Sequence, residues 1–288
     1  IPAGMFKCVI QNGQMRSIPF VKPSGNSNIN QFFNYAQARN KNCGLAGEPF
    51  RNFLIIYMLA KYGYRDIQNL TSTDGTKIFG CGLDGSEKSA TSTLADGFAR
   101  QQNIKTGACL ALGYNDGKAE VIDADNYTCH SVNVGVWENP FGQYWEMDGH
   151  LCSIGNDVYQ WDDNFMPTGK PTVDTFAAVK HIKMTRLASE GSSDADINLI
   201  TTAGSQHMSH VPFKQHTGIT YGDHYYYGAE GQLWFGGGAS YRGSHCGLAC
   251  ASSYYAWSYA IANISARLDY HGELKEVTSA ELKRVLAA

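Results

Sequence analysis

The stretch Phe235-Gly-Gly-Gly-Ala-Ser-Tyr-Arg-Gly-Ser-His-Cys-Gly-Leu248 decides how this sequence is interpreted. Glycine tolerates tight turns and the close approach of other backbone, so this density of glycine indicates a constrained loop rather than a helix. The apolar run Leu233–Phe235 leads into the loop, and the run Tyr225–Tyr227 lies before it, across a glycine turn at 228–231. We expect these two runs to be strands that pair with each other around that turn.

The segment that follows the glycines, Ala239–Ile261, is rich in tyrosine and serine. Tyrosine supplies a large, rigid contact area and serine supplies adaptable hydrogen bonds, a mixture typical of antibody binding loops. Tyr254 and Tyr255 are adjacent, and successive side chains of an extended segment point to opposite faces, so at least one ring must be exposed if this segment is extended. The composition therefore favours a binding surface, with the alternative that an individual tyrosine is a core residue.

The overall composition argues against several classes of protein. The chain has 288 residues, of which 43% are hydrophobic and 17% charged, as in an ordinary globular protein. A formal net charge of -3 argues against nucleic-acid binding, and the sequence has no run of about 18 apolar residues that would predict membrane insertion. The eight cysteines form no CxxC pair, so we expect buried thiols and leave open whether Cys246 and Cys250 pair. The chain begins at Ile1 with no signal-peptide pattern, and we expect it to be part of a longer protein.

Local patterns predict helices near the front of the chain and short strands behind them. Two helices are expected, over Ile29–Arg39 and from Glu48 to Lys61, the second one ended by Gly63. A third, short helix is expected around Leu94–Gln102, after a loop over residues 70–92. Strands are expected at Met5–Ile10, Ile18–Val21, Ala119–Ile122, His130–Trp137, Gln143–Trp145, Val158–Gln160, Val179–Met184 and Thr217–Tyr221. We predict one α+β domain over residues 46–288, with residues 1–45 packed on it as a strand and helix segment.

Several pieces of the sequence, taken in order, resemble a known family. The pieces are Phe50–Gln68, Lys105–Ala108, Gly135–Gly149, and Phe235–Leu248 leading into Asn263–Leu268. They are similar to the C-type-lectin-fold variable proteins of diversity-generating retroelements, which include phage receptor-binding proteins of the major-tropism-determinant type. The resemblance covers roughly residues 47–272. In that family a tryptophan follows the glycines, whereas Gly238, Ala239 and Ser240 stand at the corresponding place here.

The resemblance implies a C-type-lectin-like fold with two N-terminal helices, short antiparallel strands and long loops. It also implies that Asn263–Arg267 closes the fold as a strand and that residues 239–261 form a hypervariable region. The residues Glu138–Glu146 lack the Glu-Pro-Asn order that C-type lectins use for calcium-bound sugar, so calcium-dependent glycan binding is not implied. The side chains expected to contact a ligand are Tyr241, Arg242, Ser244, His245, Ala249, Ala251, Ser252, Tyr254, Tyr255, Ser258, Tyr259 and Ile261.

A restricted set of residue types agrees with such diversification. Retroelements of this kind randomise adenines, and the Asn codons they target cannot become Lys, Glu, Gln, Met or Trp. From Ala239 through Gly272 the sequence contains no Lys, Glu, Gln or Met, and its one tryptophan there is Trp257. We expect a non-enzymatic protein without cofactor or metal, which binds a host-cell surface protein or glycan receptor. The expected location is the tail tip of a virion or the surface of a bacterial cell, and a homotrimer is one option.

Four alternatives remain open from the sequence. A formylglycine-generating-type cysteine oxidase shares the fold superfamily and would use Cys246 and Cys250 as reactive thiols. A zinc site would combine imidazole and carboxylate ligands; its candidate ligands are His207, His210, His216, Asp223 and His224. A purely structural virion or surface protein would bury the tyrosine-rich segment in a subunit contact. A cellular surface adhesin would use the same segment for binding outside a virus.

Overall fold

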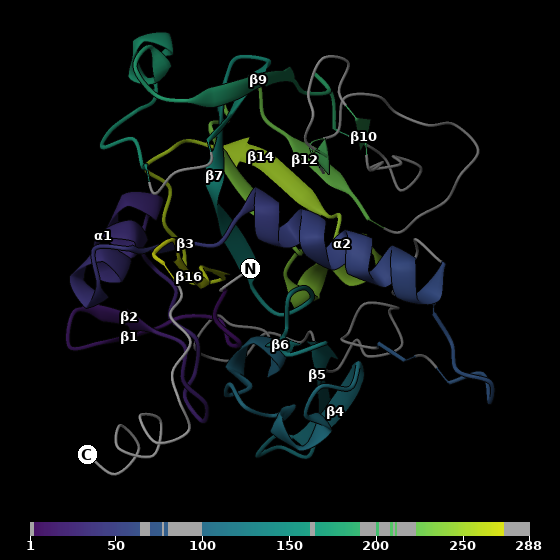
Figure 1. Cartoon of the computed structure of the whole chain (residues 1–288). Coiled ribbons are helices and arrows are strands. Elements are labelled where there is room, and N and C mark those ends of the chain that lie inside the picture. The colour runs from purple at the N-terminus through teal and green to yellow at the C-terminus, as the bar shows by residue number, and fades with distance from the viewer. Residues whose placement is uncertain are drawn as a thin grey trace.

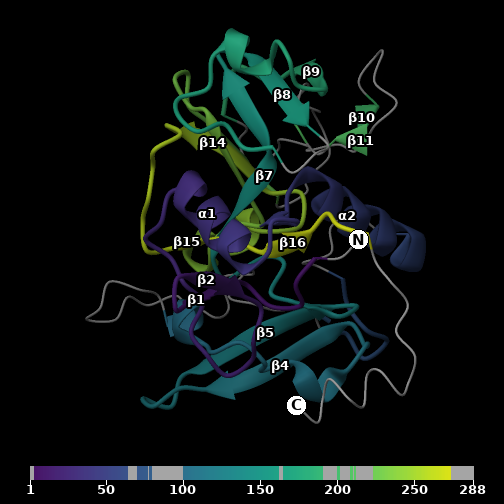
Figure 2. The same ribbon diagram turned by 60° about the vertical axis from the view of Figure 1, so that its left-hand side comes forward.

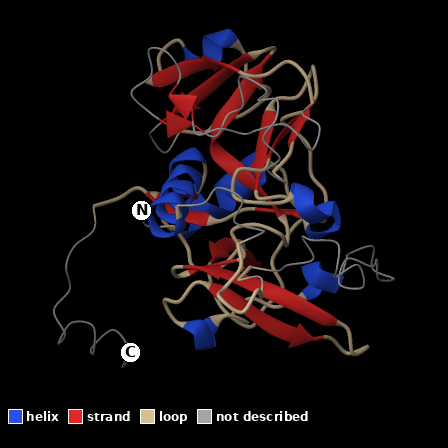
Figure 3. Ribbon diagram, turned by 90° about the vertical axis from the view of Figure 1, so that its right-hand side faces the viewer, coloured by secondary structure: helices blue, strands red, loops and turns tan. Residues whose placement is uncertain are grey.

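The computed structural model describes residues 3–63, 70–76, 78–79, 100–161, 165–190, 200–201, 208–209, 211 and 223–273. Within these residues the fold is α+β, as the sequence predicts. It contains two α-helices and five β-sheets, of which one has seven strands and the other four have two or three strands each. The largest sheet occupies one end of the molecule and a three-stranded sheet the other, with both helices between them (Figures 1 and 2). Figure 3 shows the same division in a third view, by type of secondary structure.

Both predicted helices are confirmed almost to the residue. Helix α1 (Ile29–Arg39) begins with a capping box, in which the Asn28 side chain accepts from the Gln31 backbone and the Gln31 side chain accepts from the Asn28 backbone. Helix α2 (Glu48–Tyr62) has a proline in its first turn and ends at Gly63, whose φ of 62° is the left-handed conformation that glycine adopts easily.

The large sheet contains seven strands, and the strand order places β14 near one edge. In order they are β12 (Tyr225–Tyr227), β14 (Ala251–Tyr255), β13 (Leu233–Gly236), β7 (Trp145–Ile154), β8 (Asp157–Trp161) and β9 (His181–Thr185). The seventh strand, β15 (Ile264–Ser265), lies parallel to β7, beside Trp145 and Glu146. The resemblance had implied a closing strand in this region.

The expected pairing of Tyr225–Tyr227 with Leu233–Phe235 is wrong. Strand β14 lies between these two strands, parallel to β12 and antiparallel to β13. The glycines at 228 and 231 explain how β14 fits there. A Cβ atom on Gly231 would lie 1.8 Å from the carbonyl oxygen of Ser253 and one on Gly228 would lie 2.4 Å from that of Tyr254, so these glycines let β14 approach closely.

Four smaller sheets complete the described part of the chain. Strands β1 (Val9–Gln11) and β2 (Gln14–Arg16) form a hairpin, and β3 (Cys43–Leu45) pairs with β16 (Leu268–Tyr270). The three-stranded sheet is β4 (Gly117–Ile122), β5 (Thr128–Val134) and β6 (Trp137–Glu138), and β10 (Ile200–Thr201) pairs with β11 (Met208–Ser209). Four 3-10 turns are η2 (Arg100–Asn103), η3 (Leu110–Leu112), η4 (Val173–Phe176) and η5 (Ser240–His245).

The other strand predictions had mixed outcomes. Strands near 119–122, 158–160 and 179–184 are confirmed, whereas the run expected at His130–Trp137 is divided by a turn at Gly135 and Val136 into β5 and β6. The strand expected at Ile18–Val21 is wrong because Phe20 adopts a φ of 67°. The strand expected at Gln143–Trp145 is instead β7, which is ten residues long and buried on both faces, so it shows no alternating pattern. The strand expected at Thr217–Tyr221, and most of the helix expected at Leu94–Gln102, lie outside the described residues.

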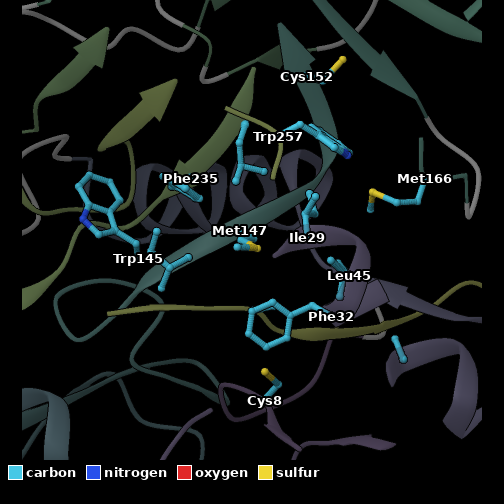
Figure 4. Close-up of a cluster of buried hydrophobic side chains, with 14 of the residues drawn as sticks. Cys8, Ile29, Phe32, Leu45, Trp145, Met147, Cys152, Met166, Phe235 and Trp257 are labelled. Atoms are coloured by element: carbon cyan, nitrogen blue, oxygen red, sulfur yellow. The ribbon is translucent and has the colours of Figure 1, made fainter. Parts of the chain in front are cut away.

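The first 45 residues share the main core with the rest of the chain. Cys8, Ile29 and Phe32 belong to one buried cluster with Trp145, Met147, Phe235 and Trp257 (Figure 4). The backbone also joins the two ends of the chain, since the Cys8 N–H donates to the Ala266 carbonyl at 2.9 Å. The N-terminal segment therefore helps to hold the C-terminal strands in place.

Candidate ligand-binding surface

Helix α2 contacts the loop of residues 236–248, which we call the glycine loop. The guanidinium of Arg51 lies against the backbone of Gly236, where an added Cβ would come within 2.1 Å of Nε. The same guanidinium donates to the Leu248 carbonyl at 3.2 Å. Gly238 has a φ of 68°, and an added Cβ there would lie 2.5 Å from the sulfur of Cys246. The loop geometry therefore depends on glycine and on the buried side chains of Arg51 and Cys246.

Strand β14 carries the tyrosines to the surface at its C-terminal end. Its first three residues are buried between the neighbouring strands, whereas Tyr254 is 52% exposed and Tyr255 is half-buried. The expectation that one of these adjacent rings is exposed is confirmed. The chain then turns at Trp257, whose buried indole donates to Asn30 Oδ1 at 2.8 Å, and this turn stacks the Tyr259 ring on Tyr255 with centroids 3.8 Å apart.

These side chains enclose a hollow of about 360 Å³, which we call the tyrosine pocket. Six of the twelve predicted contact residues line it: Arg242, Ser252, Tyr254, Tyr255, Tyr259 and Ile261. The rest of the lining was not predicted and consists of Trp145, Glu190, Tyr226, Asn263 and Ile264. The structure thus brings one half of the predicted set together at a single concave site.

Ring contacts fix the positions of the side chains that line the tyrosine pocket. Trp145 meets the Tyr226 ring edge-on at 5.7 Å, and the guanidinium carbon of Arg242 lies 4.4 Å from the centre of the same ring. Tyr255 packs against the buried Phe235 at 5.9 Å. Rings fixed in this way lose little conformational entropy when a ligand binds, which favours recognition by a preformed site.

A pair of histidines lies behind the Tyr226 wall. The rings of His224 and His245 stack with centroids 4.7 Å apart, and the Tyr226 hydroxyl lies 3.2 Å from His245 Nδ1. His224 Nε2 lies 3.2 Å from a carboxylate oxygen of Glu190. Burial lowers the pKa of His245, and the nearby charges of His224 and Arg242 lower it further, against the opposite effect of Glu190.

The remaining predicted contacts do not line the tyrosine pocket. Ala251 is completely buried beside Leu151 and Trp234, so its prediction as a contact is wrong, because β14 is an interior strand at that residue. Ala249 packs against the core, and His245 lies behind Tyr226. Ser258 lines a neighbouring hollow. The side chains of Tyr241 and Ser244 lie outside the described residues.

Sequence reasoning missed Trp145, Glu190 and Tyr226. These residues come from β7, from the segment after β9 and from β12, all of which precede residues 239–261 in the sequence. Only the strand order brings them beside β14 and β15. Asn263 is the exception, since it opens the Asn263–Arg267 segment that the resemblance had already singled out.

The two cysteines of the oxidase alternative are buried and not bonded to each other. The Cys246 thiol donates to the Ala239 carbonyl at 2.8 Å. Burial raises the pKa of the Cys250 thiol, and the nearby charge of Asp223 raises it further. A reactive cysteine needs an exposed thiol with a lowered pKa, so this arrangement offers no support for thiol chemistry.

The structure describes two of the five candidate zinc ligands, Asp223 and His224. His207, His210 and His216 lie outside the described residues. Asp223 accepts the Ala249 N–H at 3.1 Å, and His224 contacts Glu190. In the part of the chain that the structure describes, no three His, Cys, Asp or Glu side chains are grouped so as to hold a metal ion.

Neither of the two described α-helices has the length and apolar character that a membrane-spanning helix needs.

A scan of the chain against protein-family models finds no matching family, and a search of curated proteins finds no match. The function is therefore inferred from the tyrosine pocket, from its supporting residues and from the resemblance in sequence. The pocket contributes the geometry, and the resemblance contributes the class of protein.

Proposed function

We propose that this chain is a receptor-binding protein and that the tyrosine pocket is its ligand-binding surface. The observation that carries the proposal is the gathering of Arg242, Tyr254, Tyr255 and Tyr259 around one hollow. The supporting residues behind it, such as Arg51 and Trp257, are buried and contact the backbone or the core. Side chains on the surface can therefore change while the supporting residues stay the same.

The class of protein that fits this arrangement is the C-type-lectin-fold variable protein of a diversity-generating retroelement. Two early helices, short strands and a closing strand at Ile264–Ser265 are in keeping with a C-type-lectin-like fold. In such a protein, replacing side chains within residues 239–261 alters specificity without refolding. We propose attachment to a host cell from the tail tip of a phage, with a bacterial surface adhesin as the alternative setting for the same surface.

A binding experiment with intact cells tests the receptor-binding role. The labelled chain is incubated with a panel of bacterial strains, and binding is compared with that of a Tyr254→Ala, Tyr255→Ala, Tyr259→Ala triple variant. We expect the triple variant to lose at least about tenfold in affinity, since aromatic residues at the centre of a site dominate binding energy. Tyr114→Ala is the matched control, because Tyr114 is 82% exposed and lies outside the tyrosine pocket.

The outcome separates receptor binding from the alternatives. Unchanged cell binding by the triple variant would overturn the proposal, and a change in subunit association in place of cell binding would favour the structural role.

Sequencing the neighbouring DNA tests separately whether the chain belongs to a diversity-generating retroelement. We expect a near-copy of the segment that encodes residues 239–261, differing only where the copy has adenine, beside a reverse-transcriptase gene.

A further inference from the structure

The tyrosine pocket is lined by two chemically different groups of side chains. One group is aromatic and apolar, and consists of the stacked rings of Tyr255 and Tyr259 together with Ile261. The other group is charged, and consists of Arg242, which lies over the Tyr226 ring, and Glu190. A ligand that fills the pocket must therefore offer a flat apolar face and also a group that suits the charged side chains.

The aromatic group suits a ligand that carries hydroxyl groups around an apolar face. The Tyr255 and Tyr259 rings are nearly parallel, with 6° between their planes, so they form one rigid aromatic block. Ser252 and Asn263 add a hydroxyl and an amide to the same lining, and both can donate and accept hydrogen bonds. A pyranose ring has this combination of C–H faces and hydroxyl edges.

The charged group suits an anion. Arg242 is exposed, and a guanidinium offers five N–H donors in a plane that matches a carboxylate. Glu190 is the one carboxylate among the described residues that line the pocket. It lies 3.2 Å from His224, which offsets its charge whenever that imidazole is protonated.

We propose that the tyrosine pocket takes the terminal residue of an acidic glycan, with the sugar carboxylate at Arg242 and the sugar ring against Tyr255 and Tyr259. This inference rests on the proposed receptor-binding function and names its ligand class. The volume of about 360 Å³ lies at the lower end of the range for pockets that enclose a small molecule. A sugar terminus is a better match for that volume than the broad contact of a folded protein.

The histidine pair gives this ligand class a pH signature. The groups that face His245 are His224 and Tyr226, Arg242 of the same 3-10 turn, and Glu190. A carboxylate bound at Arg242 offsets the positive charge that disfavours protonation of His245. The bound state therefore takes up protons, and by linkage the acidic sugar binds more tightly as the pH falls from about 7.5 to about 5.5.

Two matched pairs of sugars test the ligand class. Glucuronate is compared with glucose and galacturonate with galactose, because each pair shares its ring and differs at C6, where a carboxylate replaces a hydroxymethyl group. Calorimetry on the full chain, in buffers of different ionisation enthalpy, measures both affinity and proton uptake. We expect at least one acid to bind about tenfold or more tightly than its neutral partner, with net proton uptake.

Variants at position 242 test whether Arg242 causes the preference for the acidic sugar over the neutral one. Arg242→Gln should reduce the affinity for the acidic sugar to that for the neutral one, whereas Arg242→Lys should retain part of the preference because it keeps the charge. Ser258→Ala should leave all affinities unchanged, since Ser258 is exposed and lines a different hollow. An array of longer acidic and neutral glycans extends the same comparison to chain termini that a monosaccharide cannot mimic.

Several outcomes would overturn the ligand class. Equal binding of acidic and neutral sugars would do so, and so would a preference that survives Arg242→Gln. Absence of binding to every glycan on the array would also overturn it. The same holds if binding to cells survives periodate oxidation of the surface sugars but is lost after protease treatment. In these cases, loss of cell binding by the triple tyrosine variant would still support the receptor-binding role, so the two proposals fail separately.

Discussion

The Nζ atom of Lys7 lies 2.8 Å from Oε2 of Glu146, although the two residues are 139 positions apart in the chain. Both side chains are buried. Arg267 also donates to Glu146, from Nε at 3.2 Å to Oε1, and Nη2 of Arg51 lies 4.0 Å from Oε1. One carboxylate therefore joins the N-terminal segment, helix α2, strand β7 and the C-terminal strands, and it comes directly after Trp145, which lines the tyrosine pocket.

Removing the charge of Glu146 should destabilise the whole fold. Glu146→Gln leaves Lys7 and two guanidinium groups buried without their carboxylate, and breaking a buried ion pair in this way costs about 3–5 kcal/mol. Urea unfolding measures the loss in the free energy of unfolding. Asp157→Asn is the control, because its pair with Lys183 is exposed and should contribute less than about 1 kcal/mol. Equal losses in the two variants would contradict the central role of Glu146.

The same carboxylate predicts how stability depends on pH. Burial alone would raise the pKa of Glu146, but Arg267, Lys7 and Arg51 together hold it at about 2, below its usual value of 4.5. A depressed pKa in the folded state stabilises the protein above the unfolded value, and this contribution is lost as the pH falls from about 4.5 towards 2. Thermal unfolding across this range should show a decline that is smaller in Glu146→Gln. An identical decline would show that other groups cause it.

The glycine loop gives a prediction with a matched control. Gly238→Ala places a Cβ 2.5 Å from the Cys246 sulfur at a φ of 68°, whereas Gly13→Ala has a similar φ of 72° and no atom within 4 Å. Backbone strain alone costs about 1–2 kcal/mol. We expect Gly13→Ala to lose about that amount and Gly238→Ala to lose clearly more, as measured by denaturant unfolding. Similar losses would mean that the loop relaxes around the added methyl group.

The thiols should resist alkylation while the protein is folded. Burial raises the pKa of Cys8 to about 11 and that of Cys109 to about 12, and it raises the pKa of Cys152 and Cys250 as well. Iodoacetamide followed by peptide mass spectrometry should modify these four residues slowly at pH 8 and rapidly after unfolding. Rapid labelling of Cys250 in the folded protein, with loss of a catalytic activity, would favour the oxidase alternative.

The sequence predicted the elements whose signals are local. Both helices were found almost to the residue, and for α2 the early proline and the terminal glycine were the signals. The exposure of one ring of the adjacent pair Tyr254 and Tyr255 followed from the alternation of side chains along a strand, and the structure shows that this ring is Tyr254. These features depend on neighbouring residues alone, which is why a single sequence contained enough information.

Features that depend on strand order could not be predicted. The insertion of β14 between β12 and β13 is a long-range event, and it buries Ala251 and brings Tyr226 to the pocket. Strand β7 was missed over most of its length because both of its faces are covered, which removes the alternating pattern. One half of the predicted contacts line the tyrosine pocket because the composition of a segment says which residue types suit binding, but not which of them face outward.

Photo-crosslinking from Tyr254 tests the receptor-binding role most directly. A benzoylphenylalanine side chain replaces Tyr254 in one sample and Tyr114 in another, and each sample is irradiated while bound to a strain that binds the unmodified chain. We predict that the probe at Tyr254 crosslinks to a cell-surface molecule, that excess unmodified chain prevents this crosslink, and that the probe at Tyr114 gives none. Crosslinks from Tyr114 alone, or crosslinks from Tyr254 only to a second copy of the chain, would contradict a ligand-binding tyrosine pocket.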